Sequence, residues 1–302
     1  MSALQQSFHP LEVIVVDNSS SDATPEEVPK RFGSVRYVRQ ANRECAGAYN
    51  AGFDVASGEF IQFVDGDDIL VPNKIAKQVE IFRTNPELDI VYGDVRMFQT
   101  MKGVANWTDA PTQPESDMLS ALLVPEKLGA GLSALGALFR RRALETVGPW
   151  DETLYCEDTD YWLRAAWAGC RFGHCPGSPM GFKRMWSGQK TANVSATTRG
   201  LEAVWDKALS YVTRDPYRNL LAERLAELRF YMAVSRSQLS VAEALAKLAL
   251  ARSTAPKKVS ALTYAFGYGA IVLPGGSYLV RSRLLHSVRR FLASLFGYRK
   301  SR

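Results

Sequence analysis

The feature that most constrains the fold is a set of short apolar runs that end in acidic residues. Residues 11–16 (LEVIVV) form a β-branched run that ends at Asp17, and residues 59–64 (EFIQFV) run directly into the sequence Asp-Gly-Asp-Asp at 65–68. Runs of this length and composition are typical of strands that are buried on both faces, as in a parallel sheet. The chain therefore predicts an α/β fold whose strands carry acidic side chains at their carboxyl ends.

Helical patterns separate these runs. One covers residues 46–57 and another covers 72–84, while further strands are predicted at 34–39 and 88–95. Strands that alternate with helices at this spacing indicate βαβ units and a mostly parallel sheet, whose ligands gather at the carboxyl ends of the strands. The acidic ends are therefore predicted to bind a nucleotide and its metal. The alternative is an ordinary Asp-rich turn, which Asp17 alone fits equally well.

Composition excludes several other classes of protein. Of the 302 residues, 23% are charged and 46% are hydrophobic, which is ordinary for a globular chain. The four cysteines form no CxxC pair and have no partnered histidine spacing. The sequence thus suggests neither a disulfide framework nor a zinc site, and a reduced, cytosolic compartment is expected. The first ten residues lack the basic start and apolar run of a signal peptide, so we expect that the domain does not cross a membrane.

Charge is distributed unevenly along the chain. After Glu243 there is no acidic residue, and the last 59 residues carry a formal charge of +11. Because the whole chain carries +6, residues 1–243 carry −5. An acidic body with a strongly basic tail predicts an anionic partner for the tail.

The C-terminal part is predicted to be helical from about residue 198. Residues 259–280 contain no charge and are long enough to span a bilayer, but glycines and a proline interrupt them, which disfavours a membrane-spanning helix. In residues 281–296, leucines and phenylalanines fall on one helical face and arginines lie off it. This pattern favours a helix in an anionic membrane interface over one that docks on the rest of the chain. No nucleic acid partner is expected, because no recognition motif accompanies the charge.

Four segments, taken together, resemble the inverting family 2 glycosyltransferases of the GT-A fold. They are EVIVVDNSSSDAT at 12–24, AGAYNAGFDVASGEFIQFVDGDDILVP at 46–72, GALFRRRALETVGPWDE at 136–152 and EDTDYWLRAAWAG at 157–169. Each segment alone is a weak signal, but all four occur in the family's order and at about its spacing. The resemblance implies a Rossmann-like GT-A catalytic domain over residues 1–197, followed by a helical region with the basic tail at 198–302.

The resemblance also implies which residues bind the donor. Asp17 and Asn18 match the positions that read the nucleobase, where a carboxylate or an amide can hydrogen-bond to uracil or its equivalent. Asn50 matches an asparagine of the helix before the acidic strand, and Asp65 matches the carboxylate that faces the ribose. These four side chains are therefore expected to contact a nucleotide-diphosphate sugar.

The remaining acidic residues are implied to do the chemistry. Asp65 and Asp67 match the family's Asp-x-Asp element, and the resemblance implies that Asp67 or Asp68 holds the metal. A divalent cation, Mn²⁺ or Mg²⁺, held by oxygen ligands would neutralise the charge that develops on a diphosphate leaving group. Asp158 matches the general base that takes the proton from the attacking hydroxyl. Glu157 beside it is expected to orient the acceptor or to raise the pKa of Asp158 as a like-charged neighbour.

The sequence departs from the family pattern at three places. The family opens with a strand that forms one wall of the base pocket, and this sequence starts after that strand. Tyr49 stands where the family often has an arginine before Asn50, and residues 182–185 (FKRM) stand where a Tyr-Arg-x-His element often closes the site. Because a methionine thioether is a poor ligand for a hard cation, Lys183 or Arg184 is expected to meet the diphosphate instead.

These observations predict a hexosyltransferase-like enzyme that moves a sugar from a nucleotide-diphosphate sugar to an acceptor hydroxyl with inversion. We expect it to act in cell-surface polysaccharide or glycolipid synthesis, on a saccharide or lipid-linked acceptor, at the inner face of the cell membrane. Two alternatives remain open. One is a catalytically impaired nucleotide-sugar-binding or scaffold protein derived from the family, and the other is a nucleotidyltransferase, which also uses paired aspartates.

Overall fold

The computed structural model describes residues 1–41, 44–98, 106–108, 117–124, 132–235 and 239–272. The chain divides into two compact units, which are described separately. Unit 1 comprises residues 1–118, 132–153 and 161–187, and unit 2 comprises residues 119–131, 154–160 and 188–302. Helix α7 (Glu157–Trp167) contributes its first four residues to unit 2 and the others to unit 1.

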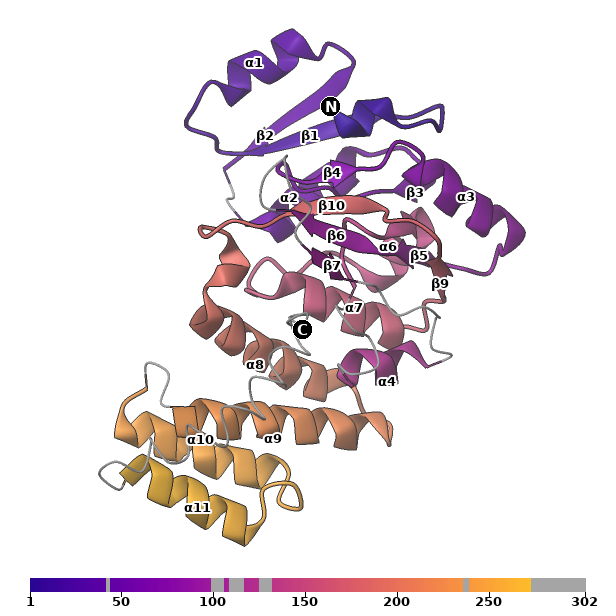
Figure 1. Ribbon diagram of the computed structural model, residues 1–302. Coiled ribbons are helices and arrows are strands. Elements are labelled where there is room, and N and C mark those ends of the chain that lie inside the picture. Colours follow the sequence, from indigo (N-terminus) through magenta and orange to yellow (C-terminus); the bar gives the residue numbers. More distant parts are fainter. Residues whose placement is uncertain (42–43, 99–105, 109–116, 125–131, 236–238, 273–302) are drawn as a thin grey trace. The chain divides into compact units, whose positions relative to one another are not determined.

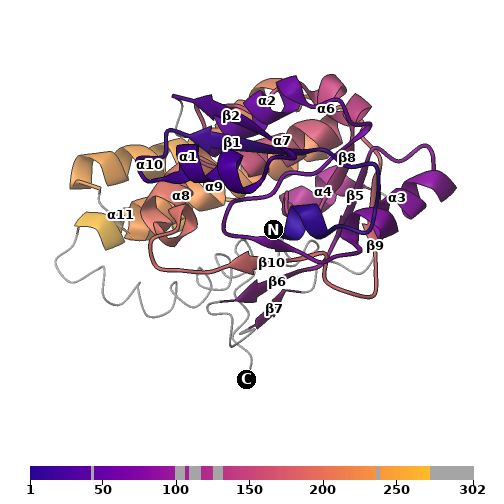
Figure 2. The ribbon, with the colours of Figure 1, turned by 90° about the horizontal axis from the view of Figure 1, so that it is seen from above.

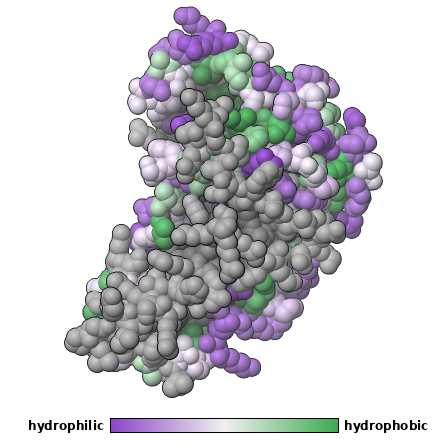
Figure 3. Space-filling model, viewed as in Figure 1, coloured by the Kyte–Doolittle hydropathy of each residue, from purple (hydrophilic) through white to green (hydrophobic). Residues whose placement is uncertain are grey.

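Unit 1 is an α/β structure, as the sequence predicts (Figure 1). Its helices are a 3-10 turn at Ser2–Gln5, α1 (Thr24–Arg31), α2 (Cys45–Val55), α3 (Lys74–Thr84) and α6 (Arg141–Val147). Its strands are β1 (Val13–Asn18), β2 (Val35–Gln40), β3 (Phe60–Ile61), β4 (Ile69–Leu70), β5 (Ile90–Gly93), β6 (Val95–Phe98), β7 (Asn106–Thr108), β8 (Leu138–Arg140), β9 (Phe172–Cys175) and β10 (Gly181–Arg184). Helix α1 buries no residue, and its outer surface is hydrophilic (Figure 3).

The described strands form the sheets β1-β2, β4-β10-β6-β7 and β3-β8-β5-β9. Their pairing is mixed, which differs from the mostly parallel sheet that the sequence suggested. The pairs β1–β2, β5–β9 and β6–β10 are parallel, but β8 runs between β3 and β5 in the opposite direction, and β4 returns antiparallel along β10. Figure 2 shows β10, β6 and β7 side by side.

The predicted strand at 88–95 is divided between two sheets. Residues Ile90–Gly93 pair with β8 and β9, whereas Val95–Phe98 pair with β10 and β7, and the change of sheet falls at Asp94. The predicted strand at 59–64 pairs only over Phe60–Ile61 in the described residues. The strand β1 pairs with β2 along one edge, and no described strand pairs with its other edge.

A hydrophobic cluster fills the space between α3 and the sheet. Its buried members are Ile75, Val79, Phe82, Val91, Leu138, Cys175 and Met180. Phe82 and Val91 are fully buried, which shows that the apolar face of α3 is packed directly on β5. Burial of such side chains is the main source of stability of a domain of this kind.

A polar network lies inside this apolar region. The side chain of Lys74 is fully buried, and its Nζ atom donates to the neutral oxygens of Gln62, Gln78 (2.5 Å) and the Ala137 carbonyl (3.2 Å). Gln78 Nε2 in turn donates to the carbonyl oxygen of Val91 at 2.9 Å. Burial lowers the pKa of Lys74 well below its usual range. The network ties α3 to the segments that contain β3, β5 and β8.

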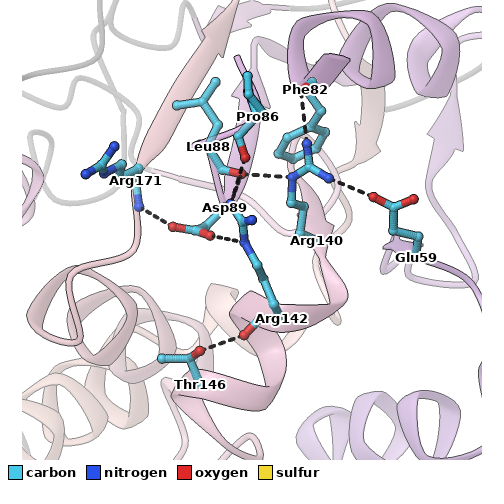
Figure 4. A network of polar contacts seen from close by, with 9 residues as sticks. All are labelled: Glu59, Phe82, Pro86, Leu88, Asp89, Arg140, Arg142, Thr146 and Arg171. Atoms are coloured by element: carbon cyan, nitrogen blue, oxygen red, sulfur yellow. Dashed lines mark hydrogen bonds and ion pairs between the residues drawn. The ribbon is translucent and has the colours of Figure 1, made fainter. Parts of the chain in front are cut away.

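The acidic residues that stand immediately before β1, β3 and β5 each have positively charged or N–H partners. Asp89, before β5, accepts a hydrogen bond from Arg142 Nε at 2.8 Å and another from the Arg171 backbone N–H at 2.9 Å (Figure 4). Arg142 also donates to the carbonyl oxygens of Pro86 and Leu88. This network fixes the connection between α3 and β5 against the start of α6.

Arg140 holds the neighbouring part of this end of the sheet. Its guanidinium group pairs with Glu59, before β3, at 2.7 Å (Figure 4). The same group lies over the rings of Phe60 and Phe82. Glu12, before β1, accepts from the backbone N–H groups of residues 57 and 58. Hydrogen bonds from Ser57 lower the pKa of Glu12.

Unit 2 is helical. It contains α4 (Met118–Leu123), a 3-10 turn at Lys190–Ala192, α8 (Val194–Tyr211), α9 (Tyr217–Ser235), α10 (Val241–Thr254) and α11 (Ala261–Val272). The buried Arg229 of α9 donates to Glu202 Oε1 of α8 at 3.0 Å and to Thr254 of α10 at 2.8 Å, and Lys247 of α10 also pairs with Glu202. A charged network therefore joins α8, α9 and α10.

The uncharged stretch predicted at 259–280 is described only as far as Val272, where α11 ends. The basic amphipathic helix predicted at 281–296 lies outside the described residues. Among the helices that the structure describes, none is long and apolar enough to cross a membrane.

Candidate functional site

The acidic loop, residues 65–68, lies between β3 and β4. Its chain reverses through a hydrogen bond from the Asp68 N–H to the Asp65 carbonyl at 3.0 Å. Strand β4 follows at once and pairs with β10, and the Arg184 backbone N–H at the end of β10 donates to Asp68 Oδ1 at 2.9 Å. Two segments more than a hundred residues apart in sequence are thus joined at the position where the sequence predicted a metal and a diphosphate.

Burial dominates the electrostatics of Asp68. Its side chain is buried, and desolvation raises the pKa of Asp68 to about 7, although the Arg184 N–H and the positive charge of Lys183 act in the opposite direction. The neighbouring charges of Asp65 and Asp67 raise this pKa further. A bound cation would relieve both the burial cost and the repulsion among the three carboxylates.

The residues of the loop are of the type that holds a hard divalent cation. Among the described residues, no group of three or more acidic, histidine or cysteine side chains converges on one point. However, Mg²⁺ is commonly bound by one or two carboxylates, and substrate phosphates and water supply the remaining oxygens. The carboxylates of Asp67 and Asp68 fit that requirement, and their mutual repulsion favours it.

Asp65 is held by residues that the sequence analysis did not assign to the site. The Tyr49 hydroxyl donates to Asp65 Oδ1 at 2.6 Å, and the Cys45 thiol lies 3.7 Å from the same oxygen. Both side chains come from α2. The only signal in the sequence was the presence of Tyr49 where the family often has an arginine.

Asp17 and Asn18 lie together at the carboxyl end of β1, but they have partners within the protein. The buried Asp17 carboxylate accepts from the Ser20 N–H at 2.8 Å and from the Tyr37 hydroxyl at 2.5 Å. These hydrogen bonds, from Ser20 first and Tyr37 second, lower the pKa of Asp17. Asn18 accepts from Gln40 and donates to the backbone carbonyl of Glu44, just before α2. The amino-terminal end of α2 therefore touches both Asn18 and, through Cys45, Asp65.

Asn50 binds another part of unit 1. Its Oδ1 atom accepts from the Trp150 N–H at 2.8 Å, and its Nδ2 atom donates to the Trp150 carbonyl and to Glu152, each at 2.9 Å. Asn50 therefore fixes the turn after α6 against α2. In the structure its amide group is occupied by this contact.

Lys183 and Arg184 lie at the end of β10, where Arg184 is exposed and Lys183 is half-buried. Backbone pairing with β6 on one side fixes this end of the strand, and the Met185 N–H extends the pairing to the Phe98 carbonyl at 2.8 Å. Both cationic residues thus lie next to the acidic loop, and their predicted contact with a diphosphate stays a prediction.

Glu157 and Asp158 begin α7 and belong to unit 2, so the structure describes their surroundings within that unit. Glu157 is buried and its Oε2 atom pairs with Lys190 Nζ at 2.9 Å. Burial, and next the charge of Asp158, raise the pKa of Glu157. Asp158 is exposed, and its Oδ1 atom accepts from the Thr159 N–H at 2.7 Å. Of the two carboxylates, Asp158 is therefore the one that a substrate can reach.

Comparison with known proteins places the chain among glycosyltransferases. Residues 1–148 match the family described as glycosyl transferase family 2. An uncharacterised glycosyltransferase of Nostoc sp. is 31% identical over 163 residues, which are 50% of this chain and 48% of that protein. The poly-beta-1,6-N-acetyl-D-glucosamine synthase of Staphylococcus epidermidis is 26% identical over 163 residues, 52% of this chain and 39% of that protein. The chain thus spans about half or less of the length of these relatives.

Solved structures show the same fold. Residues 1–349 of S. aureus TarS, in complex with UDP-GlcNAc, superpose with a TM-score of 0.64 at 18% identity, over 96% of this chain and 86% of that one. The mannosyltransferase PcManGT from Pyrobaculum calidifontis, in complex with GDP-Man and Mn²⁺, gives a TM-score of 0.54 at 20% identity, over 98% and 79%. The fold and the family match define the class of protein, a glycosyltransferase. The chain belongs to glycosyl transferase family 2 through residues 1–148 and has the GT-A fold.

Proposed function

We propose that this chain transfers a sugar from a nucleotide-diphosphate sugar to the hydroxyl group of an acceptor, with inversion at the sugar carbon. The acceptor oxygen forms the new bond to that carbon as the bond to the diphosphate breaks, and the hydroxyl proton passes to a carboxylate. The diphosphate leaves with its electron pair and needs positive charge near it.

The observation that carries the proposal is the junction between the acidic loop and the end of β10. The bond between the Arg184 N–H and Asp68 brings three carboxylates and two cationic side chains to one edge of unit 1. Carboxylates at this edge suit a divalent metal and the ribose, whereas Lys183 and Arg184 suit the diphosphate. An Asp-rich turn without a ligand does not require both kinds of charge together.

We assign the general base to Asp158. The accessible carboxylate of Asp158 is available to take the proton from an acceptor hydroxyl. Glu157 is assigned a supporting role, because its ion pair with Lys190 fixes the first turn of α7.

A divalent cation, Mn²⁺ or Mg²⁺, is proposed as the cofactor, with Asp67 and Asp68 as its protein ligands. Bound there, it would supply Lewis-acid stabilisation of the leaving diphosphate. Support comes from the chemistry of the loop and from PcManGT, whose solved complex contains Mn²⁺.

The acceptor is proposed to be a saccharide or a lipid-linked saccharide in cell-surface polysaccharide or glycolipid synthesis. The similarity to the poly-beta-1,6-N-acetyl-D-glucosamine synthase supports this role. We further propose that the basic segment 281–296 holds the protein on the anionic inner face of the cell membrane. Sedimentation of the full chain with vesicles containing anionic lipid, but not with neutral vesicles, tests that attachment.

Thermal unfolding with ligands tests the proposed function. The full chain is heated with Mn²⁺ and, in turn, UDP, GDP or dTDP, with Asp67→Ala as the control. A ligand at a hundred times its dissociation constant stabilises a protein by about 2.7 kcal/mol, which raises the unfolding midpoint by several degrees. A metal-dependent shift with one nucleotide, lost in Asp67→Ala, is expected and would identify the base of the donor.

A specific observation favours the second candidate, a catalytically impaired binding or scaffold protein. The polar groups of Asp17, Asn18 and Asn50, which were predicted to contact the donor, are engaged within the protein. If no nucleotide shifts the midpoint of the cooperatively folded chain, the scaffold role replaces the transferase; if a nucleotide binds but no sugar is transferred, the impaired binding protein does.

A further inference from the structure

The proposed function assigns no role to Tyr49, although its side chain contacts the acidic loop. Tyr49 lies in the second turn of α2, and its hydroxyl donates to Asp65 Oδ1 at 2.6 Å. Burial, followed by the negative charge of Asp65, raises the pKa of Tyr49 well above its usual range. The phenol therefore stays protonated and acts as a hydrogen-bond donor throughout the physiological range.

Aromatic packing fixes the direction of this donor. The Tyr49 ring centroid lies 4.7 Å from that of Phe63 and 5.0 Å from that of Trp150. Trp150 is itself buried, stacks on Tyr161 at 4.0 Å and is held through its backbone by Asn50. Edge and stacked contacts of this kind restrict the orientation of each ring. These contacts therefore restrict the direction from which the Tyr49 hydroxyl donates to Asp65.

The consequence is an asymmetric carboxylate at Asp65. Its Oδ1 atom receives the Tyr49 hydroxyl and faces the Cys45 thiol, whereas no described residue donates to Oδ2. A carboxylate held at one oxygen has a defined plane and can present the other oxygen to a ligand. A phenol also leaves the negative charge of Asp65 uncompensated, which an arginine at the same position would not.

We propose that Tyr49 is a positioning residue that aims Asp65 Oδ2 at a ribose hydroxyl, so that selection of ribose over deoxyribose depends on Tyr49. This inference rests on the proposed function, since it requires that the acidic loop binds a nucleotide. The ligand it selects is a ribonucleoside diphosphate, because a ribose hydroxyl can donate to the open oxygen of the Asp65 carboxyl group, whereas a deoxy sugar lacks one such donor.

The test compares two variants that each remove one hydroxyl group from the same aromatic cluster. Tyr49→Phe removes the donor to Asp65, whereas Tyr161→Phe removes a buried hydroxyl that has no hydrogen-bond partner in the described structure. Both keep the ring, and circular dichroism confirms that each variant is folded at the temperature used. Calorimetry with Mn²⁺ then measures the dissociation constants of UDP, 2′-deoxy-UDP and 3′-deoxy-UDP, or of the guanosine series if the wild type binds GDP.

Because a hydrogen bond to a charged group is involved, we expect the wild type and Tyr161→Phe to bind the ribonucleotide about tenfold or more tightly than at least one deoxy analogue. In Tyr49→Phe this ratio is expected to fall below about threefold through weaker ribonucleotide binding, while affinity for that analogue stays within about twofold. A merely structural role would weaken all of the nucleotides alike.

The outcomes distinguish failure of the proposed function from failure of the role assigned to Tyr49. If the wild type binds no nucleotide, both the proposed function and the inference are overturned. If the wild type selects ribose and Tyr49→Phe selects it equally well, or loses all nucleotides to the same degree, only the role of Tyr49 is overturned. A wild type that prefers the deoxy form also contradicts the inference and leaves the proposed function intact.

Discussion

Two sets of acidic residues in unit 1 differ in how the protein compensates their negative charge: the residues that precede β1, β3 and β5, and those of the acidic loop. At the amino-terminal ends of these strands, Glu59 and Asp89 pair with arginines, and Glu12 accepts backbone N–H groups. In the acidic loop, Asp65 accepts from a phenol, and Asp68 accepts from one backbone N–H while its pKa is raised to about 7.

The difference separates structural carboxylates from functional ones. A compensated carboxylate stabilises the fold and has no need of a ligand, whereas an uncompensated one costs stability until a cation or a hydroxyl group arrives. Four changes test this distinction, and they are given in order of decreasing expected effect.

Asp67→Ala is expected to have the largest effect, because it removes a proposed metal ligand. We expect the affinity for UDP or GDP in the presence of Mn²⁺ to fall about 100-fold or more, with little change in the midpoint of unfolding without ligand. Calorimetric titration measures the affinity. Asp54→Ala removes an exposed carboxylate of α2 and should leave it unchanged. Equal loss in both variants would contradict a specific role for the acidic loop.

Asp89→Ala is expected to act on stability rather than on binding. It removes the acceptor of Arg142 Nε and of the Arg171 N–H, so the free energy of unfolding should fall by about 2 kcal/mol. Denaturant titration measures this change, and Glu145→Ala on the exposed side of α6 serves as the matched control. A variant Asp89→Ala that keeps the wild-type free energy of unfolding but no longer binds the nucleotide would contradict the purely structural role of Asp89.

Asp68→Asn should change how stability depends on pH. Because the folded pKa of Asp68 is raised, its favourable contribution is present at low pH and is lost as the pH rises through about 7. Without metal, the free energy of unfolding of the wild type, relative to Asp68→Asn, is therefore expected to fall by about 2 kcal/mol between pH 5 and pH 8. Denaturant titrations at both pH values measure it. A constant difference between the two proteins would show that Asp68 is ionised throughout.

Glu59→Gln should have the smallest effect. The pair with Arg140 is short, but the Glu59 side chain is 68% exposed, and exposed ion pairs contribute little. We expect a loss of less than about 0.5 kcal/mol in the free energy of unfolding, because Arg140 keeps its contacts with Phe60 and Phe82. A loss above about 1 kcal/mol would mean that the ion pair between Glu59 and Arg140 itself stabilises the fold.

The periodicity of the chain predicted the α/β class and the positions of most strands, because each strand is an apolar run with a polar boundary. It could not predict that the chain changes sheet at Asp94, since only the partner strands of β5 and β6 decide the pairing. The short strand β4 gave no signal either, as two residues define no period.

The acidic loop was predicted from residue type alone, since three carboxylates in four positions need an explanation wherever they lie. The hydrogen bonds that these carboxylates form could not be predicted from residue type. The hydrogen bond of Tyr49 to Asp65 spans 16 residues and that of Arg184 to Asp68 spans 116, so they depend on packing between distant segments. The ion pair of Glu157 with Lys190 spans 33 residues and depends on packing in the same way.

The buried amine of Lys74 has a consequence for the way in which unit 1 opens. Its partners come from α3, from the residue after β3 and from the residue before β8, and Gln78 extends the network to β5. None of these segments can separate alone without leaving a polar atom unsatisfied in an apolar interior. Their backbone amide protons should therefore exchange with solvent deuterium at one common, slow rate, as a single cooperative block that includes the strand leading into the acidic loop.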